Sequence, residues 1–573
     1  MSVRARIWPI LRPQRWLILG AAAGIVGATA ITIAGPALVR YAIDAGIDKH
    51  RTGPIDRAAL AYVGLVLVRP LLERVVVICS ARAGERFLGD LRVEAFDHLQ
   101  RLSVPFFERE RAGKLISRLT ADVQTLTTFT RQVLVEVVGS ILLLTVTAAV
   151  IVSMSPLLSL VTLVSVPLLV VAGVRYQRRS RPTYLALRDR VADTLTSLQE
   201  GLAGMRVVQT FRREQEQFDG YELRSSAQVR AWRRVSLVNV TFFPAITLAQ
   251  SVATATVLAA GGVLYDRGQV TKGTLVAFAL YLVSLFDPIA RLGDWFSEFQ
   301  SGRAALTKIV GLLETPVTVV PGTRELPAEG RLEARGVTFA YDDATVLHDV
   351  TLAIEPGESI ALVGATGAGK STLAKLLTRQ YDPGEGTVRF GGVDLREAAP
   401  GSLRRRIVFL PQEGHLFSGS IAENVRLART DASAGEVERA LRAVGALDRF
   451  ASLPDGIQTD VQTRGVRLSS GERQLVALAR VALADPAVIV LDEATSSLDP
   501  GTEAAVERAL AAVSRGRTVI TIAHRLSTAE RADRVAVLDH GRLIEIATHD
   551  ELVERGDHYA KLWASWQSAE AAA

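Results

Sequence analysis

The first half of the chain contains six long apolar runs separated by polar segments. The runs lie near residues 16–40, 58–81, 133–153, 156–174, 240–264 and 273–297. Each is long enough to cross about 30 Å of hydrocarbon as a helix. Because lipid offers no partners to backbone N–H and C=O groups, each run is predicted to be a membrane-spanning helix. Only residues 153–156, which read Ser-Met-Ser-Pro, separate the third run from the fourth, so this pair is predicted to form a tight hairpin.

Basic residues in the connections predict how these helices are oriented. Nine Lys or Arg lie in residues 82–131 and thirteen in residues 175–234, whereas the other connections are short and carry few. Positively charged loops remain on the cytoplasmic side of a membrane. Both long loops are therefore predicted to be cytoplasmic, together with the N-terminus and everything after the sixth run. We expect a multi-pass protein of the plasma (inner) membrane.

The two cytoplasmic loops are predicted to be helical hairpins rather than disordered segments. In the first loop, apolar residues recur every three or four positions, as on one face of a helix. These residues are Leu88, Leu91, Ala95, Leu99 and Leu102. The predicted turning points are Gly113 in the first loop and Gly201 or Gly204 in the second. Two antiparallel helices of this length reach about 35–40 Å from the membrane, either as solvated stalks or as levers that contact a soluble domain.

The composition changes after about residue 310. Residues 311–330 contain several Pro and Gly and are predicted to be a linker, whereas residues 331–573 begin with strand-like alternation. The chain has 573 residues, of which 49% are hydrophobic and 22% charged, and its mean hydropathy is +0.23. The predicted fold class is therefore a multidomain membrane protein. A six-helix, all-α transmembrane domain over residues 1–310 is followed by a soluble α/β domain.

Composition also excludes several classes of protein. The apolar content is too high for a disordered chain. The single cysteine, Cys79, excludes a disulfide scaffold. The net charge of +6 resides mainly in basic residues between the apolar runs. Anionic lipid headgroups account for that placement better than nucleic acid does, so no nucleic-acid partner is expected.

A glycine-rich loop supplies the first chemical motif, and it directly follows an apolar strand at residues 360–363. The loop consists of Gly364, Ala365, Thr366, Gly367, Ala368, Gly369, Lys370, Ser371 and Thr372. In this G-x-x-x-x-G-K-[ST] pattern, backbone N–H groups wrap phosphate oxygens and the next helix directs its N-terminus at them. Lys370 would neutralise the β- and γ-phosphates, and the Ser371 hydroxyl would ligate Mg²⁺.

A second motif lies at the end of another apolar strand. Residues 488–491 are four apolar β-formers, which is typical of a buried parallel strand. Asp492 at its end can hold the Mg²⁺ shell. Glu493 beside it can polarise an attacking water, because phosphoryl transfer to water requires an oriented nucleophile. With a phosphate loop upstream, these acids are interpreted as functional rather than as two solvated residues at a strand end.

Between these motifs, the sequence Leu-Ser-Ser-Gly-Glu-Arg-Gln begins at residue 468 and opens a helix. Its candidate nucleotide-binding residues are Ser469, Ser470, Gly471 and Glu472. The alternative interpretation is a capped helix without a ligand. This segment and its distance from Asp492 establish a resemblance: residues 330–565 are similar to the nucleotide-binding domain of an ATP-binding cassette (ABC) transporter.

The resemblance implies further site residues and two cofactors, ATP and Mg²⁺. Tyr341 resembles the aromatic residue that stacks on adenine, and Gln412 resembles the glutamine that senses Mg²⁺ and the dimer interface. Residues 496–499 resemble the loop that connects the two nucleotide sites. His524 resembles the switch histidine that contacts the γ-phosphate, so it joins Glu493 as a catalytic candidate. The candidate metal-binding residues are Ser371, Gln412 and Asp492.

The membrane half resembles the six-span exporter type of this family. Residues 105–123 and 202–209 are similar to its two intracellular loops, whose tips are coupling helices that rest on the ATPase domains. The family's working unit has two membrane halves and two cassettes. Each ATP lies between the phosphate loop of one cassette and the signature helix of the other. The chain is therefore identified as half a transporter, which needs a second half-transporter chain and a lipid bilayer.

Three departures from the family pattern lie on the face that serves the partner's nucleotide. The usual signature is Leu-Ser-Gly-Gly-Gln, but here Ser470 replaces a glycine and Glu472 replaces the glutamine. Upstream, Thr463 stands where the family usually has glutamate. The phosphate-loop side, with Glu493 and His524, is intact. This pattern favours a heterodimer over a homodimer.

The predicted function is transport of a substrate across the membrane by alternating access, driven by ATP hydrolysis, with export favoured. Two alternatives remain open: an importer of the same fold for metal chelates or siderophores, and a non-pumping, ATP-gated membrane protein. The transported substrate is not readable from the sequence. A few charged residues within the spans either form structural pairs or line a substrate path. They are Arg69, Glu73, Asp287, Arg291 and Asp294.

Overall fold

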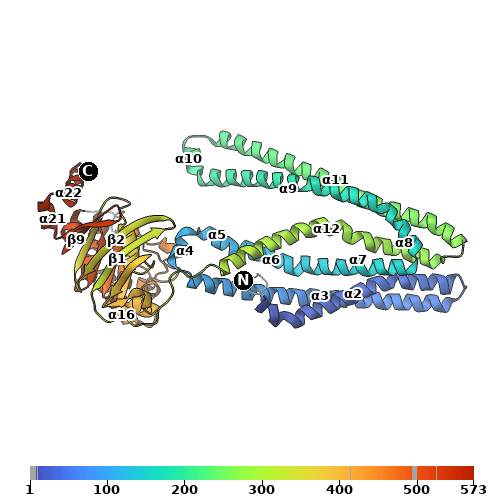
Figure 1. Cartoon of the computed structure of the whole chain (residues 1–573), viewed down its shortest axis with the longest axis horizontal. Helices are drawn as coiled ribbons and strands as arrows, with labels where there is room; N and C mark the ends of the chain where they lie inside the picture. Colours follow the sequence, from blue (N-terminus) through green and yellow to red (C-terminus); the bar gives the residue numbers. More distant parts are fainter. Residues whose placement is uncertain (1–7, 10, 413, 493–499, 524–525, 573) are drawn as a thin grey trace. The chain divides into compact units, whose positions relative to one another are not determined.

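The computed structural model of the chain describes residues 8–9, 11–412, 414–492, 500–523 and 526–572. They form two compact units (Figure 1). The first unit comprises Met1–Gln100 and Ala112–Thr315, and the second comprises Arg101–Arg111 and Pro316–Ala573. A short stretch of the first long loop thus belongs to the second unit.

The first unit is built of helices in the predicted order, which confirms the N-terminal helical membrane domain (Figure 1). The helices are α2 (Arg15–Tyr41), α3 (Thr52–Arg101), α5 (Ala112–Ser117), α6 (Val123–Thr128), α7 (Leu134–Met154), α8 (Pro156–Thr162), α9 (Val166–Ala203), α10 (Met205–Thr210), α11 (Glu214–Asp266) and α12 (Lys272–Leu313). Five helical stretches of the described chain are long and apolar enough to cross a membrane. The second predicted span lies in α3, a 50-residue helix whose apolar run is interrupted by Arg69, Glu73 and Arg74.

The local sequence explains how the third and fourth spans turn. Helix α7 ends at Met154, and Ser155 has an extended backbone. The Ser155 hydroxyl accepts a hydrogen bond from the Leu158 amide at 3.4 Å and so caps α8. Pro156 occupies the first position of α8, where a missing N–H leaves no hydrogen bond unmade. The predicted tight hairpin is confirmed.

The turning points of the two long loops were predicted correctly in only one case. Helix α9 ends at Ala203, and Gly204 caps it as expected. Gly113 is wrong as a turning point because it lies inside α5. The first loop instead breaks at Ser103 and again at Glu110, both with extended backbones.

The predicted apolar face of the first loop is buried, and α9 and α11 run side by side as the second helical hairpin (Figure 1). Leu88, Leu91 and Ala95 are each 1% exposed. They pack with Val123 and Ile309, which come from α6 and from the end of α12. This confirms that the first loop is a packed helical structure rather than a solvated coil.

The second unit contains two β-sheets. One is antiparallel, with the order β2-β1-β4-β5, and the other has the order β10-β9-β3-β8-β7-β6. In the second sheet, β9, β3, β8, β7 and β6 are parallel, and β10 is antiparallel to β9. The strands are β1 (Leu332–Tyr341), β2 (Ala344–Ile354), β3 (Ser359–Val363), β4 (Glu385–Phe390), β5 (Val393–Asp394), β6 (Ile407–Leu410), β7 (Val488–Asp492), β8 (Thr518–Ile522), β9 (Arg534–Asp539) and β10 (Arg542–Ala547). The predicted α/β domain is confirmed.

The described part of this unit has three hydrophobic cores, and the first two each define a lobe. The first core joins the antiparallel sheet to one face of the parallel sheet and to α13. The second core is formed mainly by α15, α16, α18 and α19 against β6 and β7. The third packs α20, α21 and α22 against β3 and β9. The helices are α4 (Val104–Arg109), α13 (Lys370–Leu377), α14 (Pro400–Arg406), α15 (Ile421–Arg426), α16 (Ala434–Ala443), α17 (Leu447–Ala451), α18 (Ser470–Ala484), α19 (Pro500–Ser514), α20 (Leu526–Glu530), α21 (His549–Arg555) and α22 (His558–Ala572).

Candidate nucleotide-binding site

The phosphate loop connects the central strand β3 to the N-terminus of α13. Strand β3 is buried along its length because parallel neighbours flank it on both sides. The loop requires glycine at Gly364, which has a φ of +148°. A Cβ there would lie 2.2 Å from the Leu538 carbonyl oxygen on β9. The backbone can therefore curve tightly at the edge of the sheet, as phosphate wrapping requires.

Lys370 lies over this loop in a buried position, with 6% of its surface exposed. Its Nζ donates to the carbonyl oxygens of Gly364 at 2.8 Å and Ala365 at 3.0 Å. Burial lowers the pKa of Lys370, and the Asp492 carboxylate partly offsets that effect. A buried ammonium is stabilised by anionic oxygens nearby, so its position suits a phosphate ligand.

The topology brings several other predicted residues to the same edge of the sheet. Because β3, β6 and β7 are parallel, their carboxyl ends meet at one edge. Asp492 ends β7, Gln412 follows β6, and Ser371 is exposed in the first turn of α13. These are hard oxygen donors of the kind that Mg²⁺ accepts together with phosphate oxygens. Glu493, His524 and residues 496–499 lie outside the described residues.

Tyr341 adjoins the phosphate loop from the antiparallel sheet. Its hydroxyl lies 3.4 Å from the hydroxyl of Thr372 on α13. Its ring makes edge contacts with Phe339 and Tyr381, at centroid distances of 4.9 Å and 5.4 Å. The structure thus places the predicted adenine-stacking residue beside the predicted phosphate site.

The signature segment belongs to the other lobe. Ser469 caps α18, and Ser469 and Ser470 are exposed. The cap is a reciprocal pair: the Ser469 hydroxyl accepts from the Glu472 amide at 3.2 Å, and Glu472 Oε2 accepts from the Ser469 amide at 2.8 Å. The predicted capped helix is therefore confirmed. The cap is compatible with a ligand, because the Ser469 and Ser470 side chains remain exposed. Thr463 lies nearby in the chain, with its hydroxyl 3.3 Å from that of Ser418.

Glu472 has a second partner that the sequence did not reveal. Its Oε1 accepts a hydrogen bond from Arg449 Nε at 2.9 Å. Burial alone would raise the pKa of Glu472, but the hydrogen bonds from Ser469 and Arg449 outweigh burial and leave the pKa below its usual value. Arg449 is 23 residues upstream on α17, so local spacing gave no signal for the pair. The signal in the sequence was the unusual acid at position 472, because a partly buried carboxylate needs a cation nearby.

Helix α4, from the first long loop, contacts the rest of the second unit beside Tyr341. Glu108 accepts hydrogen bonds from Tyr381 Oη at 2.8 Å and from Lys375 Nζ at 3.0 Å. Arg109 pairs with Asp342, which directly follows Tyr341, at 2.7 Å. Burial, followed by the Glu108 carboxylate, raises the pKa of Tyr381. The predicted first coupling helix thus contacts residues on either side of Tyr341, the predicted adenine-stacking residue.

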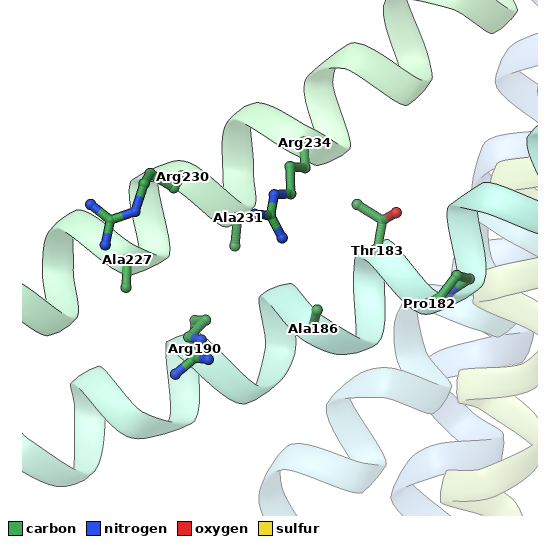
Figure 2. A pocket seen from close by; sticks show the side chains of 8 residues that line it. All are labelled: Pro182, Thr183, Ala186, Arg190, Ala227, Arg230, Ala231 and Arg234. Carbon is green, nitrogen blue, oxygen red and sulfur yellow. The ribbon is translucent and has the colours of Figure 1, made fainter.

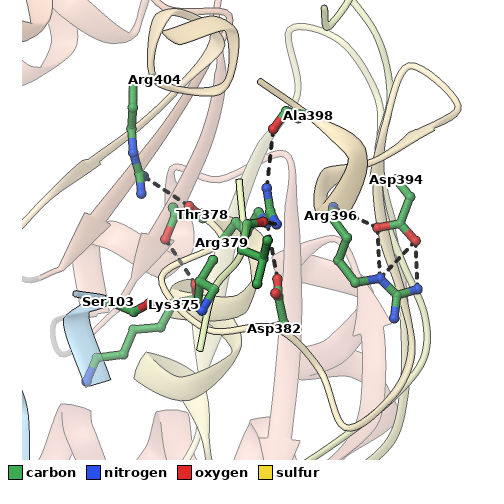
Figure 3. Close-up of polar contacts among 11 residues, drawn as sticks. Ser103, Lys375, Thr378, Arg379, Asp382, Asp394, Arg396, Ala398 and Arg404 are labelled. Atoms are coloured by element: carbon green, nitrogen blue, oxygen red, sulfur yellow. Dashed lines mark hydrogen bonds and ion pairs between the residues drawn. The ribbon is translucent and has the colours of Figure 1, made fainter. Parts of the chain in front are cut away.

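Arg379 joins the linker to this same region (Figure 3). The side chain is 4% exposed, and its guanidinium donates to the carbonyls of Val320 at 2.6 Å and Ala398 at 3.3 Å and to Asp382 at 3.1 Å. The Val319 amide donates to the Ser103 hydroxyl at 2.9 Å. The linker is therefore fixed beside α13, the helix that follows the phosphate loop.

A groove of about 460 Å³ lies between α9 and α11 in the first unit (Figure 2). Small residues face one another across it, and three arginines surround them: Arg190, Arg230 and Arg234. The loop that contains them was predicted to be cytoplasmic because of its many basic residues. Two of the charged pairs within the spans are formed: Arg69 with Glu73 at 2.8 Å, and Arg291 with Asp287 at 3.7 Å. The side chain of Asp294 lies outside the described residues.

Known proteins share both halves of this architecture. The ABC transporter transmembrane region matches residues 18–289, and the ABC transporter domain matches residues 347–496. The ATP-dependent lipid A-core flippase of Yersinia pestis is 32% identical over 565 residues, which are 97% of this chain and 96% of the flippase. The chain belongs to the ABC transporter family. Its fused membrane region and ATPase domain are of the exporter type.

Two further comparisons show how much of each known protein this chain covers. A multidrug efflux ATP-binding/permease protein of Mycobacterium tuberculosis is 36% identical over 533 residues, 92% of this ABC transporter chain but 45% of the relative. The chain thus spans about half the length of such curated relatives. The solved structure of a bacterial Atm1-family ABC exporter with ATP bound superposes with a TM-score of 0.77 at 29% identity, covering 96% of this chain and 98% of the exporter.

Proposed function

We propose that the chain is one half of an exporter that hydrolyses MgATP to move a substrate out across the plasma membrane. The observation that carries this proposal is the joint placement of Lys370 and Asp492 at one sheet edge, in a chain that also contains the membrane spans. A nucleotide site fused to membrane helices can do mechanical work on them. The position of Tyr341 beside Thr372 adds a place for the adenine ring.

The proposed hydrolytic site is assembled from groups with separate tasks. Lys370 and the amides of the first turn of α13 hold the phosphates. Ser371 and Asp492, with Gln412, would hold Mg²⁺, which neutralises charge that develops on the transferring phosphoryl group. Glu493 would orient the attacking water and His524 would contact the γ-phosphate. The signature of a second chain, equivalent to residues 469–472 here, would close over the same nucleotide.

Helix α4 is the proposed route from nucleotide to membrane. It is anchored to the cassette through Glu108 and Arg109, at the positions next to the adenine-stacking residue. In the chain it follows α3, which contains the second predicted span. Movement of the cassettes on ATP binding would therefore displace the end of a membrane helix. The tip of the second loop, α10, is proposed to couple in the same way.

The second half-transporter is proposed to be a different chain. Ser470 and Thr463 depart from the usual pattern on the face that serves the partner's nucleotide, whereas the phosphate-loop motif is complete. The third departure, Glu472, is weaker support for a heterodimer, because Arg449 pairs with its negative charge. The heterodimer proposal therefore depends on Ser470 and Thr463.

The proposed substrate class is an amphipathic molecule that partitions into the membrane. The relatives named above are a lipid A-core flippase and a multidrug efflux protein. A lipid is an amphipathic molecule, which supports this class of substrate. Two charged pairs of the spans, Arg69 with Glu73 and Arg291 with Asp287, are closed within the chain, so these four charges are compensated locally.

The test is ATPase activity in proteoliposomes, with and without a panel of amphipathic dyes and fluorescent lipids. Wild-type chain, alone and with its candidate partner, is compared with Glu493→Gln. Stimulation of hydrolysis together with accumulation of a probe on the side opposite the cassettes supports the proposal. Probe movement that persists in Glu493→Gln, or hydrolysis that moves no probe, would contradict it.

A further inference from the structure

The first turn of α18 has the properties of an anion site. Ser469 caps a 15-residue helix that runs to Ala484. The N–H groups of a first turn have no partners within the helix, and the helix dipole adds partial positive charge there. Ser469 and Ser470 are exposed at this end. A nucleotide phosphate held by an opposing chain could therefore be accepted here.

A carboxylate in this turn opposes that role unless its charge is offset. A carboxylate repels an anionic ligand, so an uncompensated Glu472 would weaken the binding of a phosphate at this helix end. Both carboxylate oxygens of Glu472 are engaged by the protein: Oε2 by the Ser469 amide and Oε1 by Arg449. The side chain is only 17% exposed. Its charge is thus turned toward a cation within its own chain.

Arg449 is held in place by the packing of its own helix. The next residue on α17, Phe450, is fully buried in a core that includes Leu475 of α18. This packing ties α17 to the signature helix and presents Arg449 to Glu472. Arg473, the cation next to Glu472 in sequence, instead donates to the Leu468 carbonyl at 2.8 Å. The cation that neutralises Glu472 is therefore Arg449, which is remote in sequence.

We propose that Arg449 is a positioning residue of the signature, which neutralises Glu472 so that the N-terminus of α18 can accept the nucleotide of the opposing chain. The proposal rests on the proposed function in one respect, namely that two chains share each nucleotide. It makes Glu472 a compensated substitution rather than an inactivating one. Loss of the cation should then harm nucleotide use only while the carboxylate is present.

The chain contains a matched control for this arrangement. Helix α16 also begins with a reciprocal serine–glutamate cap, formed by Ser433 and Glu436. Arg429 pairs with Glu436 and is 44% exposed, close to the 43% of Arg449. The α16 terminus belongs to the same lobe but not to the signature. Removing its arginine breaks an equivalent ion pair without affecting a nucleotide contact.

The experiment uses full-length chain in its dimer, reconstituted in proteoliposomes, with ATP as the varied ligand. The variants are R449M, E472Q, R449M/E472Q and the control R429M. R449M is expected to raise the KM for ATP about five- to tenfold, as for one uncompensated charge near a polyanion. The double variant should return to within about twofold of wild type, because the two changes act through one contact. R429M should leave the KM unchanged.

Two results would overturn the proposal. One is a KM for R449M equal to that of wild type. The other is a double variant as impaired as R449M, which would mean that Arg449 only supports the packing of α17. Thermal unfolding of each variant checks that the cassette remains folded. A wild-type chain that hydrolyses ATP but moves no probe would contradict the proposed function and leave these KM comparisons intact.

Discussion

The docking of α4 on the cassette gives a prediction that can be worked out from its contacts. Glu108→Ala removes a hydrogen bond from the hydroxyl of the buried Tyr381 and a partly exposed ion pair with Lys375. A hydrogen bond to a charged group contributes about 1.5–3 kcal/mol, and an ion pair at this exposure no more than about 1 kcal/mol. Since alanine favours helix at least as well as glutamate, the helix itself is retained. The change is therefore expected to weaken docking by about 2–3 kcal/mol.

Hydrogen exchange of peptides from residues 101–111 measures this loss directly. At 2–3 kcal/mol, exchange should be about 30- to 150-fold faster in Glu108→Ala than in wild type. Arg109→Ala on the same helix is the control. It removes only an exposed pair with Asp342 and should accelerate exchange less than about fivefold. Equal and small effects of the two changes would refute the assignment of Glu108 as the anchor.

Four further predictions concern the cassette. Glu493→Gln should retain ATP binding but lower hydrolysis about 100-fold or more in a purified-dimer ATPase assay. Lys370→Ala should instead weaken ATP binding itself by about 10- to 150-fold in a fluorescence titration, since it removes a charge-assisted contact. Gly364→Ala should lower the thermal unfolding midpoint and abolish ATP binding, because its Cβ would meet a carbonyl oxygen at 2.2 Å. Burial and then Glu530 raise the pKa of Tyr559 to about 12, above the value of about 10 in an unfolded chain. Its neutral form therefore adds stability below pH 10 that is lost as the pH rises toward 12, and chemical denaturation of Tyr559→Phe should lack this decline.

The membrane hairpins were predictable because their determinants are local. The turn at Ser155 needs only a serine that caps and a proline that starts the next helix. The heptad-like spacing from Leu88 to Leu102 likewise predicted one buried face. Gly113 failed as a turning point because a glycine permits a turn without requiring one. The chain instead breaks at Ser103, and a new helix, α4, begins directly after it with Pro105 in its first turn.

The candidate nucleotide site was predictable where chemistry requires fixed spacing. The phosphate loop must follow a strand and open a helix, and β3 and α13 satisfy that requirement. The roles of Lys370, Asp492 and Tyr341 stay predictions, although the structure brings the three residues to one lobe. Their proximity depends on which strands are neighbours, and strand order is a property of the whole chain.

The polar contacts around the candidate site could not be predicted from the sequence. Arg449 and Glu472 meet because α17 and α18 share one core, and Glu108 meets Tyr381 because α4 belongs to the second unit. Neither pair has a sequence spacing that indicates contact. Arg473 is the cation next to Glu472 in sequence, but it donates to the Leu468 carbonyl instead. Such contacts follow from tertiary packing, which sequence patterns alone do not specify.

The most direct test of the central claim measures whether ATP turnover moves a molecule across the membrane. Inside-out vesicles that contain the dimer are given MgATP and a fluorescent phospholipid or a lipophilic dye, and accumulation in the vesicle interior is recorded. The account predicts accumulation with wild-type protein that is lost in Glu493→Gln and with a non-hydrolysable ATP analogue. Equal accumulation with ATP and the analogue, or ATP hydrolysis by wild type with no accumulation of any probe, would contradict it.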